Sequence, residues 1–141
     1  MKINYVENKN GKLFSFHRHD YKDNIDDEEN YIMIDGGFDY HRYSGELKSG
    51  EIKDIMLEIR EQFMWGQNYD ENNNRLPETI YKPLKDLTSS HIAGIIRYLI
   101  EKMAINEEFN IYCIGQQTKA TLTIFCYELE NRLKKNNGKE I

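Results

Sequence analysis

The hydrophobic period of this chain changes near residue 49, and that change limits the folds it can adopt. Before it, short apolar runs are separated by turn signals such as Asn10-Gly11 and Asp35-Gly36-Gly37, a pattern typical of antiparallel hairpins. After it, apolar residues recur every three or four positions, which indicates amphipathic helices. Strands precede helices without alternating with them, so the sequence predicts an α+β fold with segregated layers.

We expect an N-terminal antiparallel sheet of about four strands over residues 1–45, followed by three to four α-helices over 49–135. The strands are expected near 3–6, 12–16, 31–34 and 38–43, with 23–30 forming a loop at a hairpin tip. Ser49 is a candidate N-cap for the first helix, and Gly66 is expected to end it. An ordered loop over 66–88 should lead to helices at 89–105 and 117–135, with a short helix near 109–114 between them.

Length and composition suit a single domain over residues 1–141, because the chain is aromatic-rich and can bury a core without disulfides or metal. The net charge of −5 argues against binding duplex nucleic acid, which requires a basic face. Cys113 and Cys126 form no C-x-x-C pair, and neither a signal peptide nor a membrane-length apolar run is visible. A cytoplasmic protein without membrane contact is therefore expected.

The stretch from Trp65 to His91 concentrates polar and aromatic residues, together with both prolines, ahead of a helix. A helix start exposes free N–H groups and favours anions, so Ser89, Ser90 and His91 are candidate phosphate contacts. The alternative is that this turn is only an N-cap. Likewise Trp65, Tyr81 and Lys85 could hold a nucleobase and its phosphates, or the aromatic rings could simply cover the base of the loop.

A second polar group lies in the predicted sheet. His17 and His19 could bind a metal ion with Asp35 or Asp39, or the carboxylates could pair with Arg18 and Arg42, or these arginines could contact a ligand. No G-x-S-x-G, P-loop, H-E-x-x-H or dinucleotide-binding pattern occurs. We therefore expect no enzyme, no cofactor and no metal.

Several motifs resemble those of a family of small phage and prophage proteins. The likeness covers about residues 12–132, and many family members carry cysteine pairs near the first motif that this chain lacks. The matching segments are His17-Arg18-His19-Asp20-Tyr21, Ile34-Asp35-Gly36-Gly37 with Asp39-Tyr40-His41-Arg42, Trp65-Gly66, Pro83-Leu84-Lys85-Asp86-Leu87 with His91-Ile92, and Tyr127-Glu128-Leu129-Glu130-Asn131-Arg132.

Within that group the chain is similar to the phage-encoded Thoeris anti-defence sponges. The resemblance implies a sheet followed by helices, sequestration of the cyclic ADP-ribose isomer made by bacterial TIR-domain immune proteins, and possibly binding of cyclic oligonucleotides. It also implies dimers or hexamers of dimers in the host bacterial cytoplasm. The last helix independently suggests self-association, because its apolar residues lie on more than one side: Leu122, Ile124, Phe125, Tyr127, Leu129 and Leu133.

The sequence thus predicts a non-catalytic phage protein that sequesters a small cyclic nucleotide immune signal and blocks host antiviral signalling. The alternatives are a protein-interaction module that grips a host protein through residues 66–91, and a metal-dependent nucleotide hydrolase. The candidate ligand-binding residues are Arg18, Arg42, Trp65, Tyr81, Lys85, Ser89, Ser90 and His91.

Overall fold

The computed structural model describes residues 1–17, 20–37, 42–70, 72–108 and 116–139. Within them the fold is α+β, with eight strands in three small antiparallel sheets and three α-helices. Short 3-10 helices, η1 and η2, precede α1 and α2. The elements in order are β1 (Lys2–Asn8), β2 (Gly11–Leu13), β3 (Lys22–Ile25), β4 (Tyr31–Asp35), β5 (Arg42–Ser44), β6 (Lys48–Glu51), η1 (Ile52–Asp54), α1 (Met56–Gln62), β7 (Met64–Tyr69), β8 (Arg75–Pro83), η2 (Leu84–Asp86), α2 (Ser89–Glu108) and α3 (Gln116–Lys139).

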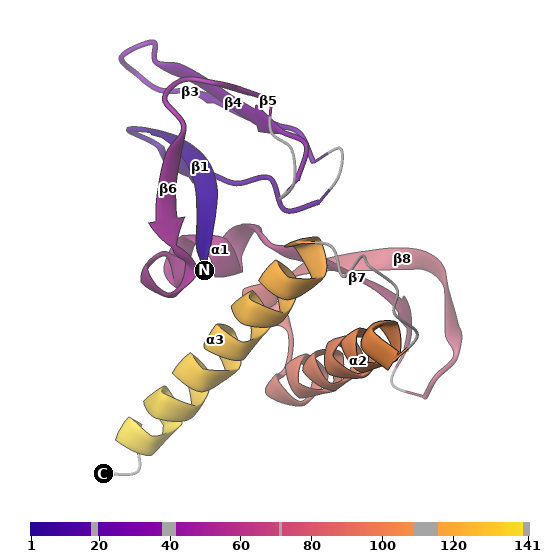
Figure 1. The fold of residues 1–141 in the computed structure, drawn as a ribbon. Helices are drawn as coiled ribbons and strands as arrows, with labels where there is room; N and C mark the ends of the chain where they lie inside the picture. Colours follow the sequence, from indigo (N-terminus) through magenta and orange to yellow (C-terminus); the bar gives the residue numbers. More distant parts are fainter. Residues whose placement is uncertain (18–19, 38–41, 71, 109–115, 140–141) are drawn as a thin grey trace.

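The expected single N-terminal sheet is instead two sheets of three strands each, in the orders β2-β1-β6 and β3-β4-β5. The β1–β2 hairpin is confirmed: Asn8 pairs with Gly11, and Gly11 has a φ of +129°, which glycine adopts without strain. The strand at β4 is confirmed as well. The two sheets pack together in the upper part of Figure 1, around Val6, Ile32 and Ile34.

The expected loop over 23–30 is shorter than predicted, because residues 22–25 pair with β4 as strand β3. Its tip is held by Asp26, which is buried. The carboxylate of Asp26 accepts hydrogen bonds from the backbone N–H groups of Lys9, Glu28 and Asn30 at 3.1, 3.0 and 2.9 Å. A buried carboxylate satisfied by the turn explains why the tip forms here. The predicted strand at 38–43 lies largely outside the described residues, which show only β5 from Arg42 onward.

The predicted helix start at Ser49 is wrong. Residues Lys48–Glu51 form strand β6, with Tyr5 opposite Lys48 and Lys2 opposite Glu51. Helix α1 begins only at Met56 and ends at Gln62, so Gly66 does not terminate it but lies in β7. Residues 48–51 pair with β1 instead of forming a helix. The helical spacing of the apolar residues applies only further along the chain, in η1 and α1.

The predicted loop over 66–88 is also wrong, because most of it forms the hairpin of β7 and β8. In this hairpin Pro83 lies opposite Met64, and the N–H of Leu84 donates to the carbonyl oxygen of Phe63 at 2.8 Å. Residues of an antiparallel strand alternate between directing their backbone N–H and C=O groups toward the paired strand and away from it. Because Leu84 bonds to Phe63, Ile80 and Lys82 also direct these groups toward β7, while Tyr81 and Pro83 direct theirs away from it. The missing N–H of Pro83 therefore costs no bond within the hairpin.

Helices α2 and α3 agree with the predicted ranges, whereas the short helix expected at 109–114 lies outside the described residues. Phe63 lies at the centre of the main core, with ring centroids 5.0 Å from Phe16 and 5.4 Å from Phe125. Figure 1 shows α3 crossing the molecule between α1 and α2. Among the described helices, none combines the length and apolar character that crossing a membrane requires.

The apolar residues of α3 are used inside the chain. Ile124 and Phe125 are fully buried, while Leu122, Tyr127 and Leu129 pack against the same core. Of the set that suggested self-association, Leu133 remains exposed. The apolar residues of α3 therefore pack inside the chain, where α3 contacts α1 and α2, and they no longer argue for self-association.

Candidate functional site

A buried ion-pair triad joins α1 to α3. Glu128 is 2% exposed, and its carboxylate lies between two arginines. Arg60 Nε donates to its two oxygens at 2.7 and 3.2 Å, and Arg132 Nε donates at 3.3 Å. Glu128 and Arg132 lie one helical turn apart on α3, whereas Arg60 comes from α1. A carboxylate so deeply buried requires this pairing.

Arg132 is fully engaged within the fold. Its Nη1 donates to the carbonyl oxygen of Leu87 at 2.6 Å and to Ser89 Oγ at 3.2 Å. Its Nη2 donates to the carbonyl oxygens of Leu84 and Lys85 at 3.1 and 3.3 Å. With Nε on Glu128, the planar fork uses its whole donor set. Arg132 therefore joins α3 to η2 and to the start of α2, and it has a structural role.

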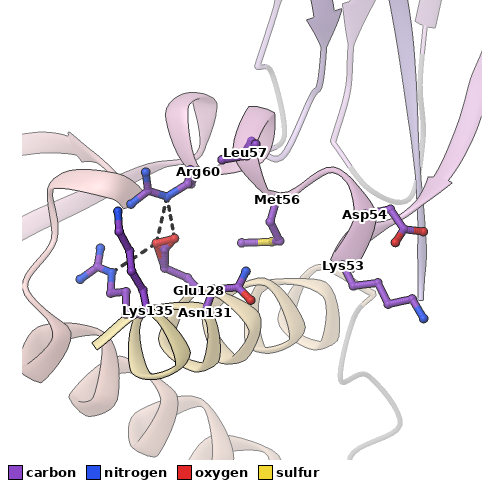
Figure 2. Close-up of a pocket in the computed structure, with 9 residues that line it drawn as sticks. Lys53, Asp54, Met56, Leu57, Arg60, Glu128, Asn131 and Lys135 are labelled. Atoms are coloured by element: carbon purple, nitrogen blue, oxygen red, sulfur yellow. Dashed lines mark hydrogen bonds and ion pairs between the residues drawn. The ribbon is translucent and has the colours of Figure 1, made fainter. Parts of the chain in front are cut away.

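Arg60 has donors to spare. Only its Nε is bonded to Glu128, and among the described residues no hydrogen-bond acceptor is recorded for its two terminal nitrogens. The side chain is 31% exposed. In Figure 2 Arg60 and Glu128 point toward one another across the space between α1 and α3. The buried carboxylate orients a guanidinium whose outer edge is available to an anion.

A groove of about 340 Å³ opens beside this triad. Figure 2 shows Lys53 at one end of it and Lys135 toward the other, with Met56 between them. Four cationic residues and two acidic ones line it, although the whole chain carries a net charge of −5. Met56 is buried and Leu57 is exposed, so the groove offers apolar contact as well. The lining residues are Lys53, Asp54, Met56, Leu57, Arg60, Glu128, Asn131, Arg132 and Lys135.

This combination suits a small anion with an apolar or aromatic part. Cations flank a hollow whose walls include a thioether and an alkyl side chain, which can contact a ring face. A volume of about 340 Å³ lies toward the lower end of the range of roughly 300–1,000 Å³ for small-molecule pockets. The groove can therefore hold a small phosphate-bearing molecule.

A second hollow, of about 570 Å³, lies where the two N-terminal sheets meet, but acidic residues outnumber basic ones around it. Lys48 donates to Glu7 at 2.7 Å. This hydrogen bond lowers the pKa of Glu7, against a smaller opposing effect of burial. In this second hollow Lys48 is thus paired with Glu7, and the net charge of the lining residues is negative. The groove between α1 and α3 is therefore the better site for an anion.

Trp65 and Tyr81 lie on paired strands but on opposite faces of the hairpin, because Trp65 is opposite Lys82 and Tyr81 is opposite Gly66. Trp65 is partly buried and its ring centroid lies 5.5 Å from that of Phe125, so it packs against the core. Tyr81 is 65% exposed. It lies opposite Gly66, where an added Cβ would come within 3.1 Å of its ring. Tyr81 therefore covers the glycine and still presents a free ring face.

The helix start is capped from within the chain. Thr88 Oγ1 accepts the N–H of His91 at 3.2 Å and its carbonyl oxygen accepts the N–H of Ile92 at 3.0 Å. The Ser90 hydroxyl lies 3.3 Å from Thr88 Oγ1, and Ser89 accepts from Arg132. Of the alternatives left open by the sequence, this geometry favours the cap.

The other predicted residues are scattered. Lys85 lies in η2 with its Nζ 3.9 Å from Glu61. Arg42 lies on β5, in the sheet remote from α2 in Figure 1, and pairs with Asp35 at 2.6 Å. Arg18 lies outside the described residues. The structure therefore gathers Lys85 and Ser89 around Arg132. It places Trp65 and Tyr81 on opposite faces of the β7–β8 hairpin, and it does not bring Arg42 to any of them.

Of the candidate metal-binding residues His17, His19, Asp35 and Asp39, only His17 and Asp35 lie within the described residues. His17 Nε2 lies 3.1 Å from the carbonyl oxygen of Met64, and its ring meets Phe63 edge-on. His19, Asp39 and His41 are outside the described residues. Within the described ranges, no group of three or more His, Cys, Asp or Glu side chains is placed to hold a metal ion.

Sequence reasoning missed the residues that line the groove. The position of Arg60 against α3 depends on a contact with Glu128, 68 positions later in the chain, which no local pattern indicates. One signal was present. The segment from Tyr127 to Arg132 was among the motifs of the resemblance, and it contains Glu128, Asn131 and Arg132 of the groove.

Comparison with known proteins adds no relative. No protein-family model matches the chain. No curated protein and no solved structure matches it either.

Proposed function

We propose that this protein captures a small phosphate-bearing nucleotide, without turning it over, in the groove between α1 and α3. The observation that carries the proposal is the groove itself, a hollow in which cations outnumber acids although the chain is acidic. In it Arg60 is held by Glu128 through Nε, and its terminal nitrogens have no recorded acceptor among the described residues. A guanidinium oriented by a buried carboxylate is a preorganised phosphate ligand.

The groove supplies a distinct contact for each part of such a ligand. Arg60 would take one phosphate by its fork, and Lys53 and Lys135 would neutralise a second phosphate from either end. Met56 and Leu57 would contact the base or ribose. Because the surroundings are acidic, the attraction is confined to the groove, which favours a compact anion over a nucleic-acid backbone.

The resemblance to the Thoeris anti-defence sponges supports a cyclic ADP-ribose isomer as this nucleotide, with cyclic oligonucleotides as a second group. Capture would lower the free concentration of an immune signal in the bacterial cytoplasm and block host antiviral signalling. A sponge requires only tight binding and slow release, and the groove offers charged and apolar contacts that support binding. The phage origin and the identity of the signal are part of this proposal.

The test begins with the protein purified from cells that make cyclic ADP-ribose isomers. Heat denaturation followed by mass spectrometry should release intact nucleotide. Titration calorimetry should then show binding of that nucleotide to emptied protein. Release of hydrolysed products would contradict a sponge and favour a hydrolase. If no nucleotide is released and none of the cyclic nucleotides binds, the proposal is wrong.

Variants locate the site. Replacing Lys53 and Lys135 together with glutamine should weaken binding about tenfold or more, because each charged contact in such a site is worth about 1.5–3 kcal/mol and 1.4 kcal/mol is tenfold in Kd. The matched control is Lys134→Gln, also on α3, whose Nζ lies 2.8 Å from Glu130 and which does not line the groove. Equal weakening by the control would show general electrostatics instead of a site.

The alternative, a module that grips a host protein through residues 66–91, draws on the exposed side chains of β8, among them Ile80 and Tyr81. The same preparation separates the two functions. A protein-gripping module would release no nucleotide, and its binding would respond to Tyr81→Ala instead of the lysine pair.

A further inference from the structure

The outer face of the β3–β4 hairpin carries three large side chains that are exposed to solvent. Tyr21, Ile25 and Tyr31 are 54%, 59% and 46% exposed. Ile25 is opposite Tyr31 in the strand pairing, and the hydroxyl of Tyr21 lies 3.2 Å from that of Tyr31, so all three share one face. The other face of β4 packs against β1 around Ile32 and Ile34, and Figure 1 shows β3 and β4 above β1. Apolar and aromatic side chains that gather on one exposed face are typical of a binding surface.

The two tyrosines lie around a carboxylate. Asp23 Oδ2 accepts hydrogen bonds from the hydroxyls of Tyr21 and Tyr31 at 3.1 and 3.4 Å, and Asp23 is itself exposed. A guanidinium can pair with carboxylate oxygens through its planar fork and stack on an aromatic face at the same time. An ammonium group lacks that plane, so the arrangement favours arginine over lysine.

The net charge of the chain is concentrated in the same hairpin. Residues 20–31 contain six acidic residues and one lysine, a net charge of −5 that equals the charge of the whole chain. The rest of the chain therefore carries 18 acidic and 18 basic residues, which balance. Asp26 is buried within the turn, but Asp27 and Glu29 are exposed. A surface with this charge attracts a basic partner and repels nucleic acid.

The acidic hollow between the two N-terminal sheets adjoins this face. Tyr31 and Glu29 line it, and its lining includes four acidic side chains and two lysines. Its volume is about 570 Å³. A long basic side chain can enter such a hollow, because its alkyl stem packs against the walls while its charged end meets the carboxylates.

We propose that this face binds an arginine-bearing segment of another protein, with a guanidinium placed over Tyr21 and Tyr31 and paired with Asp23. The proposal does not depend on the nucleotide site, which lies between α1 and α3. The acidic turn attracts the basic segment from a distance, and the exposed rings supply the contact area at the centre of the interface. The neighbouring hollow takes a second basic side chain of the same segment.

A short basic peptide tests the chemistry. In a fluorescein-labelled peptide of alternating arginine and serine, the guanidinium groups lie on one side of an extended chain. Fluorescence anisotropy at low ionic strength should show binding to the natural chain, and added salt should weaken it. The same peptide with lysine in place of arginine should bind at least about fivefold more weakly. No binding of the arginine peptide, or equal binding of the lysine peptide, would overturn the proposal.

Paired variants locate the contact. Replacing Tyr21 and Tyr31 together with alanine should weaken binding of the arginine peptide about tenfold, although the net charge is unchanged. The matched control replaces Tyr69 and Tyr98, which are 54% and 58% exposed and lie on β7 and α2. The control should bind the peptide as the natural chain does. Because all four side chains are exposed, both variants should keep the natural melting temperature, which circular dichroism measures.

A second pair of variants tests the charge. Asp23→Asn should weaken binding several-fold, whereas Glu78→Gln, the same change of charge at an exposed residue of β8, should leave it unchanged. Equal weakening by hairpin and control variants would show a general attraction and refute the proposal. Sedimentation tests the remaining occupant, a second copy of the chain. A natural chain that dimerises, with a monomeric variant lacking Tyr21 and Tyr31, would also refute it.

Discussion

Replacing Arg132 with alanine should destabilise the protein strongly, because this side chain joins three elements. Its guanidinium bonds Glu128 on α3, the carbonyl oxygens of Leu84 and Lys85 in η2, that of Leu87, and the hydroxyl of Ser89 at the start of α2. Removing it leaves those carbonyl oxygens without their donor and leaves the Glu128 carboxylate, whose side chain is 3% exposed, with one cation instead of two.

The magnitude follows from the burial. Removing one partner of a buried ion pair costs about 3–5 kcal/mol, and the lower end applies here because Arg60 still binds Glu128. We expect the free energy of unfolding to fall by about 3 kcal/mol. Since about 1 kcal/mol moves the midpoint of a domain near this size by roughly 2–4 °C, Tm should fall by roughly 6–12 °C.

Two further variants make the measurement decisive. Arg132→Lys keeps the charge but loses the planar fork, so it should recover only part of the lost stability. Arg97→Ala removes an arginine that is 83% exposed and pairs with Glu101 one turn away at 3.3 Å, and it should cost less than about 0.5 kcal/mol. Urea denaturation with a constant m-value gives all three values. If Arg132→Ala lies within about 1 kcal/mol of Arg97→Ala, the buried network does not stabilise the fold as argued.

Two other predictions concern the core and the hairpin tip. Phe63→Ala should cost about 3–5 kcal/mol by the same denaturation assay, because a fully buried ring in contact with Phe16 and Phe125 is lost; a cost below about 1 kcal/mol would contradict this packing. Burial raises the pKa of Asp26, but hydrogen bonds from Asn30, Lys9 and Glu28 outweigh it and hold the pKa below its usual range. The stabilisation from Asp26 is therefore complete above about pH 4, its unfolded pKa, and is lost as pH falls through the lower folded value. When the pH is lowered from about 5 to about 2, the free energy of unfolding should therefore fall less in Asp26→Asn than in the natural chain. If it falls equally in both, Asp26 does not contribute to stability.

Local signals were enough for several elements. The Asn10-Gly11 turn specified its hairpin, since a residue with positive φ is required there. The apolar run of β4 was bounded by a glycine pair, and the spacing of Ile92, Ile95 and Leu99 specified α2. In each case the structure depends on neighbours a few residues away, which a sequence pattern contains.

Partners distant in the chain decided the remainder. The segment from Lys48 to Glu51 could start a helix, and it is a strand because β1 offers its backbone an edge to pair with. The groove depends on Arg60 meeting Glu128, 68 positions later. No local sequence pattern indicates this contact. The two residues meet only because α1 packs against α3. Only the tertiary structure brings Arg60 of α1 and Glu128 of α3 into contact beside the groove.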